Sequence, residues 1–97
     1  MSRSLVERRL VDVSARLRAA RSELVVLDEQ LAVVSDEADD ARLRALVSET
    51  PLANREHMEA RKHADALGRS RAAAAAAVAD LESTQNRLLD QLVPESG

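Results

Sequence analysis

Apolar residues in the first half of the chain recur at alternating spacings of three and four. This spacing keeps them on one side of an α-helix, and over such a length it is typical of a coiled-coil seam. The positions are Val6, Leu10, Val13, Leu17, Ala20, Leu24, Leu27, Leu31, Val34, Ala38 and Ala41.

A weaker form of the same spacing continues in the second half, where several positions are Ala and three are polar. The positions are Ala53, His57, Ala60, Ala64, Leu67, Arg71, Ala74, Val78, Leu81, Gln85, Leu88 and Leu92. The two seams predict two long helices in a single domain over 1–93.

A short polar segment at 48–51 separates the two seams. The Thr50 hydroxyl can cap a helix, and Pro51 can take the first helical position, where a missing N–H costs nothing. We therefore expect a helix over about 4–47, a turn at 48–51, a second helix over about 51–92, and a flexible tail at 94–97. A short helix or kink near 35–47 stays open, because Ser35 could cap a helix whose first turn is acidic.

Two helices joined by so short a turn pair antiparallel, with the numbers of facing residues summing to about 99. Net charge supports this register. Residues 1–22 carry +4 and would face residues 72–97 with −3, while residues 23–50 carry −6 and would face residues 51–71 with +2. Alternating signs favour the folded-back hairpin over a parallel self-dimer, in which like charges would meet.

Composition narrows the class of protein further. The chain is 45% apolar but contains 18 Ala and no aromatic residue, so it lacks the bulk for a thick globular core. Ala, Leu, Arg and Glu all favour helix. The absence of Cys excludes disulfides and thiolate metal sites. The sequence therefore predicts an all-α, two-helix antiparallel coiled coil.

A second apolar strip runs along the first helix, on the side away from its seam. A lone hairpin buries only one face of each helix, so this strip calls for a further helical surface. We expect self-association or a helical protein partner, with a homodimer that has helix 1 of each copy at its centre as the favoured state. The expected contact residues are Val25, Val26, Ala32 and Val33.

Candidate chemistry is sparse. The histidines, His57 and His63, lack the Glu-x-x-His spacing of di-metal bundles, and Glu59 with His63 is better explained as an exposed ion pair. No nucleophile elbow or glycine-rich phosphate loop is present. We expect no enzymatic activity, no catalytic, cofactor-binding or metal-binding residues, and no small-molecule substrate.

Thirteen Arg raise the alternative of a weak nucleic-acid binder. Two observations argue against nucleic-acid binding. The chain has no aromatic residue that could stack on bases, and some arginines of the first helix flank the predicted seam, where acidic residues of the second helix could pair with them. We expect Arg9, Arg16 and Arg21 to pair with Asp80, Glu82 or Asp90. No apolar run reaches the length of a membrane span, so we expect a cytoplasmic protein without membrane contact.

The acidic run at 36–41 contains Asp-x-x-Asp-x-Ala, which resembles the tip motif of DksA-type coiled-coil factors. That resemblance implies an alternative function, a transcription regulator binding RNA polymerase through an acidic coiled-coil tip at Asp36, Asp39 and Asp40. It requires the chain to turn near 35–41. The stretch 39–67 also resembles small actinobacterial coiled-coil hairpin proteins, which implies a fold and a lineage.

Overall fold

The computed structural model describes residues 2–93 and shows an all-α antiparallel hairpin. Helix α1 spans Arg3–Ser48 and helix α2 spans Pro51–Leu92. The predicted helices and turn are confirmed to within one residue at each end. The predicted tail at 94–97 lies outside the described residues.

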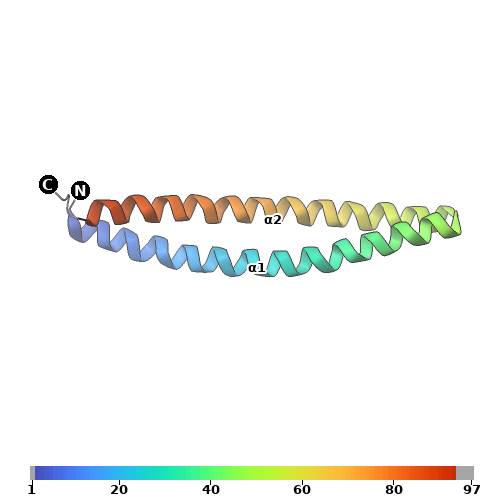
Figure 1. Cartoon of the computed structure of the whole chain (residues 1–97), viewed down its shortest axis with the longest axis horizontal. Helices are drawn as coiled ribbons and strands as arrows, with labels where there is room; N and C mark the ends of the chain where they lie inside the picture. The colour runs from blue at the N-terminus through green and yellow to red at the C-terminus, as the bar shows by residue number, and fades with distance from the viewer. Residues whose placement is uncertain (1, 94–97) are drawn as a thin grey trace. The chain divides into compact units, whose positions relative to one another are not determined.

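The chain divides into two units. Unit 1 comprises the described parts of Met1–Glu23 and Ala74–Gly97, and unit 2 comprises Leu24–Ala73. In each unit a segment of α1 lies beside a segment of α2 that runs in the opposite direction (Figure 1).

The predicted register is found in both units. In unit 1 the Gln85 amide donates to the Ser14 hydroxyl at 3.1 Å. In unit 2 the Arg71 guanidinium lies 2.7 Å from an Asp28 carboxylate oxygen. Each pair of residue numbers sums to 99, as the charge pattern and the short turn led us to expect.

The seams between the helices follow the predicted spacing, since every position of both is buried or half-buried. Leu17 is the most deeply buried large side chain, with 1% of its surface exposed. An apolar cluster in unit 1 brings together six side chains from the two helices. Its members are Val6, Val13 and Leu88 at the centre, with Leu10, Leu81 and Leu92 packed against them.

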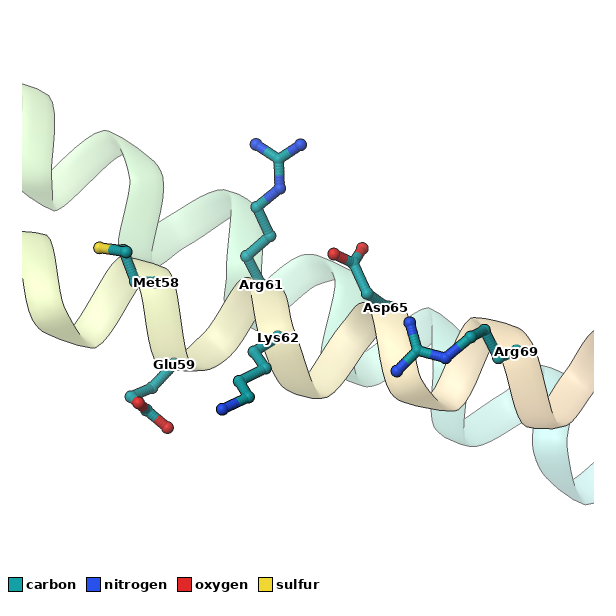
Figure 2. A pocket seen from close by; sticks show the side chains of 6 residues that line it. All are labelled: Met58, Glu59, Arg61, Lys62, Asp65 and Arg69. Carbon is teal, nitrogen blue, oxygen red and sulfur yellow. The ribbon is translucent and has the colours of Figure 1, made fainter.

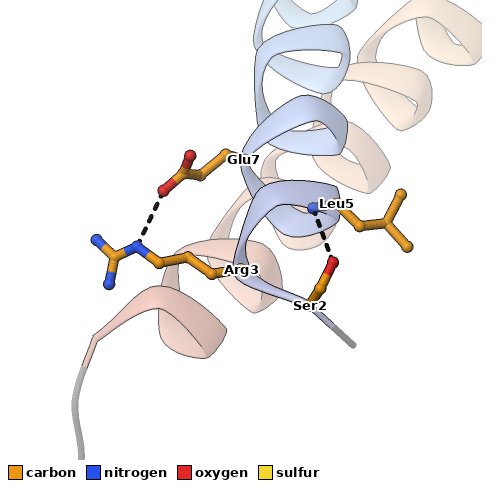
Figure 3. Close-up of polar contacts among 4 residues, drawn as sticks. All are labelled: Ser2, Arg3, Leu5 and Glu7. Carbon is orange, nitrogen blue, oxygen red and sulfur yellow. Dashed lines mark hydrogen bonds and ion pairs between the residues drawn. The ribbon is translucent and has the colours of Figure 1, made fainter.

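The helix ends are capped by local hydrogen bonds. The backbone N–H of Leu5 donates to the Ser2 hydroxyl at the start of α1, as Figure 3 shows. Thr50 caps α2 as predicted, because its Oγ1 accepts from the N–H of Ala53 at 3.1 Å. The first positions of both helices therefore have partners for donors that the helix itself leaves free.

Glu49, the residue directly after α1, has a left-handed backbone conformation that the sequence did not indicate. Glu49 has a φ of 51°, and its N–H donates to the carbonyl of Ala45 at 3.1 Å. This is the single-bond left-handed cap of a helix C-terminus, a place usually taken by Gly or Asn. A side chain at this φ costs about 1 kcal/mol, and in return the chain reverses within two residues.

The alternative of a separate short helix that begins near Ser35 is wrong. Helix α1 continues through this region to Ser48, and Ser35 is a half-buried helical residue. Neither Gly nor Pro occurs between residues 3 and 48, so nothing in the sequence opposes the α-helix there. A possible cap does not interrupt a helix whose seam continues on both sides of it.

Candidate protein-interaction surface

The strip predicted from the sequence is exposed on α1, opposite the seam. Val25, Val26 and Val33 expose 55%, 49% and 58% of their surface, and Ala32 is also exposed. All four belong to unit 2. We call these residues the valine strip. The hairpin leaves apolar surface in solvent on two consecutive turns of one helix.

A hollow adjoins the valine strip. It has a volume of about 290 Å³ and is lined by Glu29, Gln30, Val33 and Val34. Its solvent-facing surface is almost entirely apolar, because the two polar residues contribute their methylene groups to its walls. The space can accept a short aliphatic side chain from a partner.

A second exposed apolar group lies near the turn and was missed by the sequence analysis. Leu43, Leu46 and Val47 are exposed on the last turns of α1. Their spacings of three and four place them on one face, and heptad spacing shows that this is the face of the valine strip. The signal was present in the sequence, but the acidic residues at 36–40 interrupt the strip and hide its continuation.

The predicted acidic residues Asp36, Asp39 and Asp40 are exposed on the same face, between the two apolar groups. They lie inside α1, and the turn falls at Glu49 and Thr50. The resemblance to a polymerase-binding tip required the chain to turn within or beside this acidic run. The structure corrects that expectation, since these carboxylates lie on the side of a helix rather than at its tip.

The arginines at the start of α1 form ion pairs of two kinds. Arg21 reaches Glu82 of α2 at 3.9 Å, which confirms one of the expected pairings. Arg16 instead lies 3.4 Å from Asp12 one turn away on its own helix. Arg3 pairs with Glu7 in the same way at 3.0 Å (Figure 3). Acidic neighbours thus neutralise part of the positive charge that would bind the phosphates of a nucleic acid.

One hollow on α2 is lined mainly by charged side chains. It has a volume of about 380 Å³ and is lined by Met58, Glu59, Arg61, Lys62, Asp65 and Arg69. Figure 2 shows that these side chains do not converge: Arg61 extends to one side of the helix, and Glu59 and Lys62 extend to the other. A ligand would meet single charges rather than a set of groups directed at one point.

His57 occupies the seam of unit 2 as a half-buried residue, as expected. Its Nδ1 atom is buried without a hydrogen-bond partner. The hollow beside it, about 200 Å³, is lined by charged residues of both helices, including Asp39, Arg42 and Arg61. An imidazole nitrogen without a partner lacks the neighbour that would orient it as a general base.

Within residues 2–93, no group of three or more His, Asp or Glu side chains is placed to hold a metal ion. Neither helix in this part of the chain contains a stretch long and apolar enough to cross a membrane. The cytoplasmic location stays a prediction. Comparisons with protein-family models, with curated proteins and with solved structures found no match.

Proposed function

We propose that this chain is a non-enzymatic protein–protein interaction or scaffold module that binds a helical surface through the valine strip. The observation that carries the proposal is the exposure of Val25, Val26 and Val33, each about half or more, on consecutive turns of α1. Scattered exposed apolar residues are ordinary, but contiguous ones on one helix face are typical of interaction surfaces.

Covering this strip supplies part of the free energy that association needs. Full burial of a Val side chain contributes about 1.5 kcal/mol or more, so covering these residues on two chains contributes several kcal/mol. Micromolar affinity needs about 8 kcal/mol, part of which the flanking residues of the same face would supply. A homodimer with α1 of each copy at its centre, a four-helix bundle, is the favoured state.

A non-enzymatic role is supported by the surroundings of His57 and of the charged side chains on α2. His57 has no hydrogen-bond partner at Nδ1, and the charged side chains on α2 diverge. The alternative of a polymerase-binding acidic tip loses its structural premise, because Asp36, Asp39 and Asp40 lie on the side of α1. The valine strip contributes neither to the seam nor to the turn, so the fold of a single chain does not explain its apolar residues.

Sedimentation equilibrium at about 1–100 µM tests the proposal. We expect the wild-type chain to be a dimer, and Val26→Asp to be a helical monomer, because a carboxylate cannot be buried unpaired in an apolar interface. Met58→Asp is the matched control, since Met58 is exposed in the same unit but lies on α2, outside the strip. It should leave the dimer intact.

Two results would contradict the proposal. A wild-type chain that is monomeric and fully helical at about 100 µM would exclude the homodimer. A dimer that survives Val26→Asp would show that the valine strip is not the contact surface.

A further inference from the structure

On the side of α1 that faces away from the seam, residues at equal distances before and after Glu29 complement each other. Apolar residues match apolar residues, and a basic residue matches an acidic one. Four residues on either side of Glu29 are Val25 and Val33, and three on either side are Val26 and Ala32. Eleven residues on either side are Arg18 and Asp40, which have opposite charges. All of these side chains are exposed, and their heptad spacing places them opposite the seam.

We propose that two copies of this chain pair through antiparallel α1 helices, with a two-fold axis at Glu29, so that the numbers of facing residues sum to 58. The proposal rests on the proposed function and specifies its partner and register. Within the valine strip apolar residues then meet apolar residues, and each Arg18 meets Asp40 of the second copy. In the same register, one heptad further along, Val11 meets Val47, and both are exposed in the single chain.

Charge disfavours two other arrangements of the same two surfaces. A parallel pair would set Arg18 against Arg18 and Asp40 against Asp40, which is unfavourable. A two-fold axis one heptad further along, at Asp36, would set Val33 against Asp39, so that a carboxylate would cover part of the valine strip. Of these three arrangements, the axis at Glu29 is the one that covers the valine strip with apolar residues and pairs opposite charges at both of its ends.

The hollow beside the strip fits the same register. Its walls include Glu29 and Val33, and the register brings Val25 of the second copy opposite Val33. Packing a side chain into a hole on the facing helix is the usual way in which two helices associate closely. One contact opposes the pairing, since the two Glu29 carboxylates face each other at the axis.

A charge exchange tests the register on the full chain, with the dimer dissociation constant measured by sedimentation equilibrium. Arg18→Glu and Asp40→Arg should each weaken the dimer about tenfold, because each creates two like-charge contacts. The double variant should return to within about threefold of wild type. Arg18 and Asp40 are 22 positions apart in the sequence, far more than the three or four that let side chains of one helix meet, so restoration would indicate contacts between copies.

Cysteine crosslinking provides a second test, because the natural chain contains no Cys. Glu29→Cys lies on the axis and should form a disulfide with its own copy. Val33→Cys alone should not, but it should crosslink to Val25→Cys in a mixture of the two variants. Glu37→Cys, exposed but off this face, is the control and should form neither.

The possible failures are distinguishable. If the wild type is a dimer but the double charge variant is weaker than either single variant, the register is wrong and the proposed function stands. If Val33→Cys crosslinks to itself as readily as Glu29→Cys, the helices are parallel and the inference fails. A monomeric wild type would overturn both the homodimer and its register.

Discussion

The two units are built from the same two helices but place their large apolar residues differently. In unit 1 the largest buried side chains, Leu17 and Leu88, lie in the seam between the helices. In unit 2 the buried residues are Val34, Ala41 and Ala53, and the seam also contains His57 and Arg71. Of the eleven exposed large apolar residues within 2–93, eight belong to unit 2: Val25, Val26, Val33, Leu43, Leu46, Val47, Leu52 and Met58.

This difference indicates a division of roles. Apolar surface buried within a chain stabilises its fold, whereas apolar surface left in solvent stabilises contact with a partner. We therefore expect unit 1 to contribute most to holding the hairpin together, and unit 2 to be the part that the proposed association would stabilise.

The largest expected effect is in the seam of unit 1. Leu17→Ala should lower the free energy of unfolding by about 3 kcal/mol, because Leu17 is 1% exposed and its removal leaves a cavity. The matched control is Leu52→Ala, which removes the same atoms from an exposed position of unit 2 and should change stability by less than about 0.5 kcal/mol. Urea unfolding followed by circular dichroism measures both, and equal losses would contradict the division of roles.

A smaller effect, this time an increase in stability, is expected from a substitution in the seam of unit 2. His57→Leu should raise the free energy of unfolding by about 1 kcal/mol, because it replaces a buried Nδ1 atom that has no partner with apolar atoms. His63→Leu is the control, since His63 is exposed and its replacement removes no buried polar atom. A loss of stability in His57→Leu would show that the imidazole is satisfied in solution and that the seam is not weakened there.

Much of the fold could be predicted from the sequence, because a heptad pattern determines which face of a helix is buried. All the seam positions, the cap at Thr50, the register and the pair Arg21 with Glu82 were deduced from spacing and charge. These features depend on residues that repeat, or on short-range geometry. The exposure of Val25, Val26 and Val33 followed from the same periodicity.

The heptad pattern does not determine the remaining features. Arg16 pairs with Asp12 rather than across the hairpin, because a flexible exposed side chain has several partners of similar energy. The left-handed conformation of Glu49 is a backbone adjustment that its residue type disfavours. The continuation of the strip at Leu43, Leu46 and Val47 was obscured by the intervening carboxylates.

The measurement that tests the central claim most directly is the thermal unfolding midpoint of the wild-type chain as a function of its concentration. If the valine strip joins two copies, raising the concentration from about 1 to about 100 µM should raise the midpoint by about 5 °C or more, since dimerisation stabilises the folded chain. Val26→Asp should remove this dependence. A wild-type midpoint that stays constant over this hundredfold range would contradict the claim that the strip is covered by a second copy.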